Sequence, residues 1–135
     1  MTAVLIDSNV LLDLMTEDPK WYTCSAAAVE KAADRFRLVI NAMIYAEVSV
    51  RYSRIEDLEA ALPKSIFARE EIPYEAAFLA GKSFLEYRRR DRGRRSPLPD
   101  FFIGAHAAVA GYQLLTRDAV RYRSYFPKLQ LIAPA

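Results

Sequence analysis

Short apolar runs alternate along the chain with longer segments in which apolar residues recur at helical spacing. The runs are three or four residues long and almost entirely apolar, which is typical of strands buried on both faces of a sheet. Strands are predicted at 3–6, 38–40, 113–115 and 129–132, with a weaker candidate at 65–68. Helices are predicted at 10–15, 19–34, 41–53, 55–62, 73–90 and 101–110.

Repeated strand–helix–strand units favour one architecture. Parallel strands need helical crossovers, so the pattern predicts an α/β fold with a parallel sheet covered by helices on both faces. A length of 135 residues with 53% hydrophobic content suits a single domain spanning 1–135 and excludes a disordered chain. Cys24 is the only cysteine, which excludes an internal disulfide. No apolar run approaches the length of a membrane span, so a cytoplasmic protein is expected.

Four acidic residues fall near the predicted carboxyl edge of this sheet. Asp7 directly follows the first strand, and Asp118 closely follows the strand at 113–115. Glu47 lies in the second turn of the helix that leaves the second strand, and Asp100 opens the helix that leads into 113–115. Ligands of parallel sheets bind beyond the carboxyl ends of the strands. Each acid alone has an ordinary role as a helix cap, a turn residue or a solvated side chain, but their joint placement indicates a site.

Clustered carboxylates need a cation among them. They repel one another and raise each other's pKa, which destabilises the fold unless positive charge is added. Mg²⁺ binds oxygen ligands, commonly one or two carboxylates together with water and substrate phosphate oxygens. A metal held in this way polarises a phosphodiester and lowers the pKa of a bound water. The four acids therefore predict metal-dependent hydrolysis of a phosphodiester bond.

The charge of the chain is concentrated in one block. Residues 88–95 hold six arginines and one aspartate, whereas the whole chain has a net charge of only +2. Clustered arginines bind phosphate backbones without sequence preference; a solvated helix end accounts for the block equally well. The candidate residues for phosphate contacts are Arg88, Arg89, Arg90, Arg92, Arg94 and Arg95.

These pieces resemble a known family. The segment 4–9 (VLIDSN), Glu47, the helix that opens at Asp100 and the Leu115–Asp118 segment (LTRD) occur in the order and spacing of a PIN-domain ribonuclease. The chain is most similar to the VapC toxins of toxin–antitoxin pairs. No single piece is specific, and the resemblance rests on all four together within 135 residues.

The resemblance implies a five-stranded parallel sheet and an endonuclease that cleaves RNA. It implies that Asp7, Glu47, Asp100 and Asp118 bind Mg²⁺ or Mn²⁺ and carry the catalysis. Supporting roles are expected for their polar neighbours Asn9, Thr116 and Ser8. The expected partners are an RNA substrate, a cognate antitoxin that covers the site and a second copy of the chain in a homodimer.

Other functions stay open at this point. A stand-alone RNA-processing PIN nuclease would carry the same acids, and a non-catalytic RNA- or protein-binding module would use the same basic block. Phosphatases of the haloacid-dehalogenase type have an Asp-x-Asp motif after the first strand. This chain has Asn9 in place of the second aspartate, which disfavours that function. The only histidine, His106, lies roughly 120° around its helix from Asp100 and is predicted to be structural. Asp13 is given little weight as a supporting acid.

Overall fold

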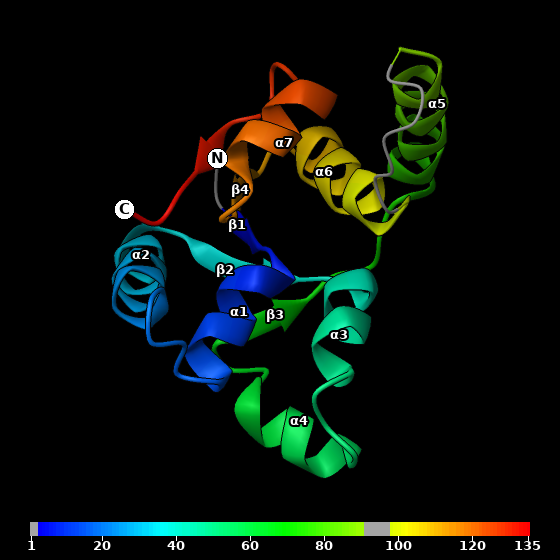
Figure 1. Cartoon of the computed structure of the whole chain (residues 1–135). Helices are drawn as coiled ribbons and strands as arrows, with labels where there is room; N and C mark the ends of the chain where they lie inside the picture. Colours follow the sequence, from blue (N-terminus) through cyan, green and yellow to red (C-terminus); the bar gives the residue numbers. More distant parts are fainter. Residues whose placement is uncertain (1–2, 91–97) are drawn as a thin grey trace.

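A five-stranded parallel sheet runs through the middle of the computed structural model, which describes residues 3–90 and 98–135 (Figure 1). The strand order is β3-β2-β1-β4-β5, and all four neighbouring pairs are parallel. The strands are β1 Ala3–Ile6, β2 Arg37–Ile40, β3 Phe67–Arg69, β4 Gln113–Leu115 and β5 Leu131–Ile132. The predicted α/β fold with a parallel sheet is confirmed.

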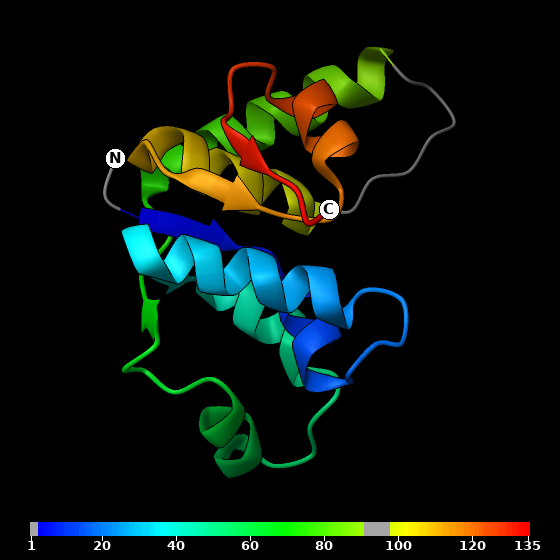
Figure 2. The same ribbon diagram turned by 90° about the vertical axis from the view of Figure 1, so that its left-hand side faces the viewer.

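Helices cover both faces of this sheet. They are α1 Ser8–Met15, α2 Tyr22–Arg35, α3 Ala42–Ser49, α4 Ile55–Ala61, α5 Tyr74–Arg90, α6 Leu98–Ala110 and α7 Ala119–Tyr125. In Figures 1 and 2, α1, α2 and α3 lie on one side of the sheet, and α5, α6 and α7 lie on the other. No helix within the described part of the chain is long and apolar enough to cross a membrane.

The centre of the sheet positions the site. All residues of β1 are buried, and Ile6 pairs with Leu115 at the carboxyl ends of β1 and β4. From these adjacent ends the chain leaves in opposite directions, into α1 on one face and into α7 on the other. This is the topological switch point at which parallel sheets form their ligand crevices.

Several helix boundaries differ from those predicted. The helix predicted at 19–34 begins at Tyr22, because the Asp18 carboxylate accepts hydrogen bonds from the backbone N–H groups of Lys20 and Trp21 and holds them in a turn. The helix predicted to reach residue 53 ends at Ser49. Asp100 does not cap its helix: α6 begins at Leu98, so Asp100 lies in the first turn.

The short helix α7 was not predicted. Its seven residues, Ala119–Tyr125, carry two arginines and follow Asp118, whose side chain makes no capping hydrogen bond. The helix forms because Tyr122 and Tyr125 are buried, with Tyr125 stacked on Phe101 of α6 at a ring distance of 4.2 Å. Tertiary packing rather than local propensity therefore stabilises α7.

Candidate active site

Asp7 lies at the centre of the candidate site. It caps α1, where its Oδ1 accepts a hydrogen bond of 2.8 Å from the backbone N–H of Ser8. Its Oδ2 accepts a hydrogen bond of 2.8 Å from the hydroxyl of Thr116, which follows β4. Both residues are buried, and the pairing of β1 with β4 places them side by side. The strand ends thus bring a carboxylate and its hydroxyl donor together from positions 109 residues apart.

Asn9 connects Asp7 to Asp118. Its Oδ1 accepts from the backbone N–H of Arg117, which fixes the orientation of the amide. Its Nδ2 then faces Asp118 Oδ2 at 3.2 Å, Thr116 Oγ1 at 3.3 Å and Asp7 Oδ2 at 3.5 Å. Thr116 Oγ1 also accepts from the Asp118 backbone N–H at 3.0 Å. Asn9 and Thr116 therefore hold two carboxylates in one hydrogen-bonded unit.

Glu47 reaches the same edge from α3. The hydroxyl of Ser8 donates to Glu47 Oε1 at 2.8 Å, which links the first turn of α1 to α3. Since Asp7 is the cap of α1, the hydroxyl of Ser8 is not used for capping. The side chain of Glu47 is half-buried. Ser8 is thus placed to orient Glu47.

Asp100 lies on α6 and is paired with an arginine that the sequence did not single out. Arg121 Nη1, on α7, donates to Asp100 Oδ2 at 3.0 Å and lies 3.9 Å from Asp118 Oδ2. Arg121 was missed because α7 itself was not predicted, so no spacing rule placed residue 121 near the acids. Its signal in the sequence is the interval of three residues from Asp118, which puts both on one face of a helical turn.

The carboxylates influence one another electrostatically. Burial raises the pKa of Asp7 from 3.8 to about 6; the bonds from Thr116 and Ser8 oppose this shift, and the charges of Asp100 and Glu47 add to it. Burial also raises the pKa of Glu47, and the charge of Asp100 contributes. The pKa of Asp100 is raised by burial against the opposing effect of Arg121. The acids are therefore close enough to destabilise each other's charged forms.

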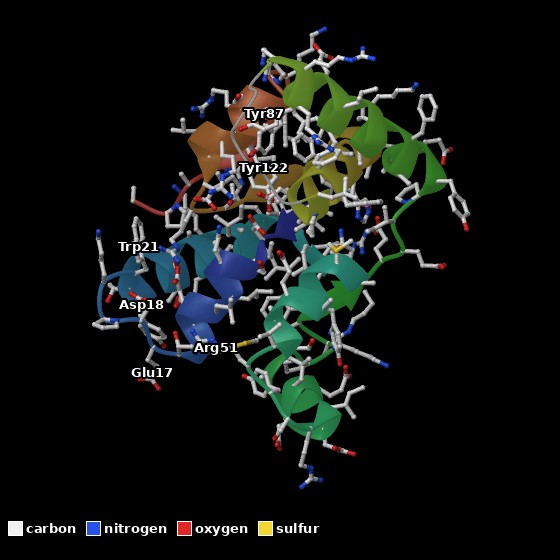
Figure 3. All side chains as sticks on the ribbon, turned by 45° about the vertical axis from the view of Figure 1, so that its right-hand side comes forward. Glu17, Asp18, Trp21, Arg51, Tyr87 and Tyr122 are labelled. Atoms are coloured by element: carbon white, nitrogen blue, oxygen red, sulfur yellow. The ribbon has the colours of Figure 1, made fainter. Side chains whose placement is uncertain are left out.

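Tyr122 adds a buried hydroxyl to this edge (Figure 3). Its side chain is 1% exposed, and its hydroxyl makes no regular hydrogen bond within residues 3–90 and 98–135. Burial raises its pKa, and the nearby charges of Asp7 and Asp100 raise it further. A contact with the Asp7 carboxylate also contributes to the raised pKa, so the Tyr122 hydroxyl lies beside Asp7 without forming a well-aligned hydrogen bond.

The donor set suits a hard divalent cation. The four acids offer only oxygen atoms, three of them have raised pKa values, and the Tyr122 hydroxyl lies beside Asp7. Mg²⁺ and Mn²⁺ prefer such ligands. However, no three His, Cys, Asp or Glu side chains in the described ranges converge tightly enough to hold an ion as they stand. The guanidinium of Arg121 forms ion pairs with Asp100 and Asp118, two of the acids that would bind the metal ion.

The loop that carries Asp118 is anchored by a further acid. Asp13, given little weight from the sequence, is 2% exposed; its Oδ2 lies 3.1 Å from Arg117 Nε and accepts a bond of 2.7 Å from the Ser25 hydroxyl. The guanidinium of Arg117 also covers the ring of Trp21 at 4.7 Å. Asp13 thus acts on the site indirectly, because it fixes the residue between Thr116 and Asp118.

His106 lies in the core and not at the surface. Its ring is fully buried between Asn41 and Glu70, with Nδ1 at 2.9 Å from Asn41 Nδ2 and Nε2 at 3.3 Å from Glu70 Oε1. Asn41 Oδ1 accepts from the Ile44 N–H, so Nδ2 is the donor and His106 Nδ1 accepts. Burial lowers the pKa of His106, which keeps the ring neutral.

Half of the basic block can be placed. Arg88, Arg89 and Arg90 form the exposed last turn of α5, where Arg88 lies over Phe84 and Arg90 over Tyr87. The predictions for Arg92, Arg94 and Arg95 lie outside the described residues. The described half of the block therefore lies at the end of α5, and α6, which carries Asp100, is the next described helix in the sequence.

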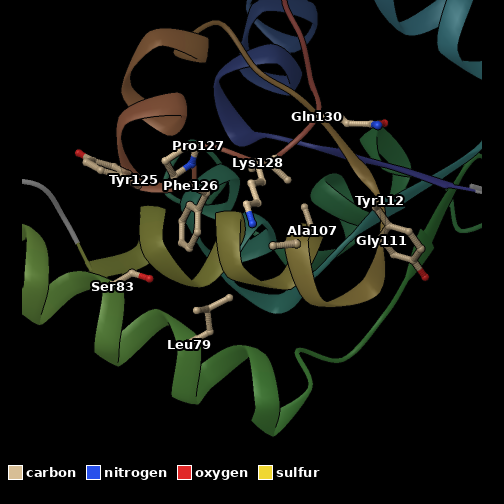
Figure 4. A pocket seen from close by; sticks show the side chains of 12 residues that line it. Leu79, Ser83, Ala107, Gly111, Tyr112, Tyr125, Phe126, Pro127, Lys128 and Gln130 are labelled. Atoms are coloured by element: carbon tan, nitrogen blue, oxygen red, sulfur yellow. The ribbon is translucent and has the colours of Figure 1, made fainter.

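A separate cavity lies on the α5–α6 side of the molecule (Figure 4). It has a volume of about 500 Å³, and its walls include Leu79, Ala107, Tyr125, Phe126 and Lys128. None of the four predicted acids lines it. The acidic edge and this apolar cavity are therefore distinct features.

Solved structures share this fold at low sequence identity. VapBC2 from Rickettsia felis, bound to a DNA fragment from its promoter, matches with a TM-score of 0.75 and 18% identity over 98% of both chains. VapBC-1 from nontypeable Haemophilus influenzae matches with a TM-score of 0.74 and 22% identity, also over 98% of both chains. VapC20 from Mycobacterium tuberculosis is described as a sarcin–ricin loop cleaving toxin. It matches with a TM-score of 0.58 and 14% identity, over 82% of this chain and 85% of its own.

Sequence comparison gives the family directly. Curated protein sequences contain no match to this chain. The family model of the PIN domain, however, matches residues 4–126, which include all four predicted acids and most of β1 with the whole of β4. This match covers most of the chain and agrees with the resemblance found in the motifs. The chain belongs to the PIN domain family.

Proposed function

We propose that this protein is a metal-dependent endoribonuclease and the toxin of a type II toxin–antitoxin pair. One observation carries the proposal: Asp7 and Asp118 are joined through Asn9 and Thr116 at the switch point of a PIN fold. Glu47 and Asp100 contribute charge to the same place. A structural role does not call for mutually repelling acids at a sheet edge, whereas a metal site does.

Each acid has a part in the proposed reaction. Asp7, Asp100 and Asp118 would hold Mg²⁺ or Mn²⁺, with Glu47 as a further ligand or as the base that accepts a proton from the attacking water. When bound, the ion supplies Lewis-acid polarisation of the scissile phosphate and lowers the pKa of water. The raised pKa of Glu47, caused mainly by burial, suits proton transfer near neutral pH.

The polar neighbours keep these acids in place. Thr116 and Asn9 orient the carboxylates of Asp7 and Asp118 through hydrogen bonds of 2.8 and 3.2 Å. The hydroxyl of Ser8 orients Glu47. Ligand orientation of this kind is what a metal site needs from the residues behind its ligands.

The similar structures support the proposed antitoxin partner, and the charge distribution supports an RNA substrate. Similar solved proteins include a toxin–antitoxin complex from Klebsiella pneumoniae and a toxin that cleaves the sarcin–ricin loop. We assign this chain an RNA substrate that approaches along the arginines at the end of α5, an antitoxin that covers the acidic edge, and a homodimeric state.

A cleavage assay on total cellular RNA tests the proposal. Purified protein with Mg²⁺ or Mn²⁺ is expected to produce discrete fragments, and EDTA should abolish them. The Asp7→Asn and Asp118→Asn variants should lose activity by at least about a hundredfold. Asp34→Asn, which removes an exposed acid of α2 outside these motifs, should cleave like the wild type. Metal-independent cleavage, or full activity in Asp7→Asn, would contradict the proposal.

A further inference from the structure

Among the described residues, Arg121 places a positive charge at the acidic edge. Its Nη1 contacts acids from two elements, at 3.0 Å from Asp100 Oδ2 and at 3.9 Å from Asp118 Oδ2. The side chain of Asp100 is 12% exposed, whereas that of Arg121 is 47% exposed. The ion pair therefore joins a largely buried carboxylate to a guanidinium that retains contact with solvent.

The other two acids are held differently. The hydrogen bonds of Asp7 come from the neutral donors of Ser8, Asn9 and Thr116, and that of Glu47 comes from the Ser8 hydroxyl. No ion pair to either acid occurs within the described ranges 3–90 and 98–135. The positive charge of the site thus lies on the Asp100 and Asp118 side.

This arrangement conflicts with metal binding by the same oxygen atoms. A guanidinium that donates to Asp100 Oδ2 occupies a lone pair that a divalent ion would need, and its charge repels the ion. The Arg121 side chain is partly exposed, so it can turn toward water without crossing the core. Departure of Arg121 would leave Asp100 Oδ2 free to bind a metal ion.

We infer that Arg121 is a resident counter-cation of the acidic site, which holds Asp100 and Asp118 in the metal-free protein and must release Asp100 when a divalent ion binds. The inference rests on the proposed function and deepens it. Arg121 then sets the metal affinity of the site, because the free energy of breaking its ion pair is subtracted from that of metal binding.

Calorimetric titration with Mn²⁺ alone, without RNA, tests this inference. Arg121→Ala is expected to bind Mn²⁺ about five- to tenfold more tightly than the wild type, because an opposing charge and a competing donor are removed. Arg123→Ala removes an exposed arginine from the same helix and is the matched control, with affinity expected within about twofold of the wild type. Arg121→Gln repeats the test with a side chain that keeps much of the volume.

The outcomes separate this inference from the proposed function. Equal or weaker Mn²⁺ binding by both Arg121 variants, with native circular dichroism, overturns the inference even if the wild type cleaves RNA. If no protein binds Mn²⁺, including the variants, both the inference and the proposed metal dependence are wrong. Tighter binding by the Arg121 variants but not by Arg123→Ala supports the inference, whether or not a cleavable RNA has been found.

Discussion

At the scale of single residues, Asp7 is held by contacts from several sides. It is 4% exposed, it caps α1, and it accepts from Thr116 across the sheet edge. It has no cationic side chain as a partner among the described residues. A buried carboxylate held only by neutral donors keeps a desolvation penalty, which the raised pKa of about 6 records.

This penalty predicts a pH-dependent stability. The pKa of Asp7 is about 6 in the folded protein against 3.8 in the unfolded chain, so its contribution to stability is fully present below pH 3.8 and is lost as the pH rises through 6. Asp7→Asn carries no charge to desolvate. At pH 7.5, without divalent ions, this variant is expected to be more stable than the wild type by about 1–3 kcal/mol.

Urea denaturation of both proteins at pH 7.5 and pH 5 measures the difference. The stability advantage of Asp7→Asn should shrink at pH 5, where the wild-type carboxyl is largely protonated. The lowered pKa of His106 also makes stability depend on pH, but it is present in both proteins and cancels in the comparison. An advantage that is the same at both pH values, or no advantage at all, would contradict the assignment of a strained, buried carboxylate.

The sequence was a good guide to some site residues and a poor guide to others. Asp7, Asn9, Thr116 and Asp118 come together because each follows a strand, and strand ends can be located from apolar runs. Arg121 and Tyr122 could not be found in the same way. Their positions depend on how α7 packs against α6, which no local pattern encodes.

At the scale of elements, the contact between α6 and α7 determines the shape of the site. Gly104 of α6 faces α7: a Cβ atom at this position would lie 2.6 Å from Phe126 Cδ2 and 3.2 Å from Tyr122 Cδ1. The absence of a side chain at residue 104 therefore lets α7 approach. This close approach brings Tyr122, and beside it Arg121, to the acidic edge.

Gly104→Ala is expected to push α7 away from α6. The added methyl group should destabilise the protein by about 1–3 kcal/mol, as overpacked cores do, and should weaken Mn²⁺ binding through displacement of the site. Gly81→Ala is the control: it lies within α5 and meets nothing within 4 Å, so it should be neutral or stabilising by up to about 1 kcal/mol. Thermal unfolding of both variants provides the measurement. A Gly104→Ala variant as stable as Gly81→Ala would show that this contact is not tight.

The strands were easier to predict than the helix ends. Uniformly apolar runs located β1, β2 and β4 to within a residue, because burial on both faces leaves a continuous apolar signal. The strands β3 and β5 are shorter than expected, at Phe67–Arg69 and Leu131–Ile132. They are the edge strands of the sheet, where burial is weaker and the pattern fades.

At the scale of the whole molecule, charge is distributed in opposite senses. The acidic edge lies at the carboxyl ends of β1 and β4, and the exposed arginines lie at the end of α5. An anionic substrate would be attracted by the exposed arginines. It would reach the acidic edge only where a cation neutralises the carboxylates. This distribution of charge is consistent with the proposed nuclease.

Charge reversal at the end of α5 tests the proposed RNA path. In an Asp7→Asn background, which prevents cleavage, Arg89→Glu is expected to weaken RNA binding and to reduce the slope of log affinity against log salt by about one. Arg54→Glu changes an exposed arginine that precedes α4 and should have a much smaller effect. Fluorescence anisotropy at several salt concentrations gives both quantities. Equal affinities and slopes for the two variants would place the RNA elsewhere.

In the proposed reaction, water activated at the acidic edge with a divalent ion attacks the RNA phosphate. The end groups of the cleavage products reveal whether water is the nucleophile. Wild-type protein with Mg²⁺ is predicted to leave a 5′-phosphate and a 3′-hydroxyl, and Asp7→Asn should leave no products. Fragments that end in a 2′,3′-cyclic phosphate would mean that the 2′-hydroxyl of the RNA is the nucleophile, and would contradict the account.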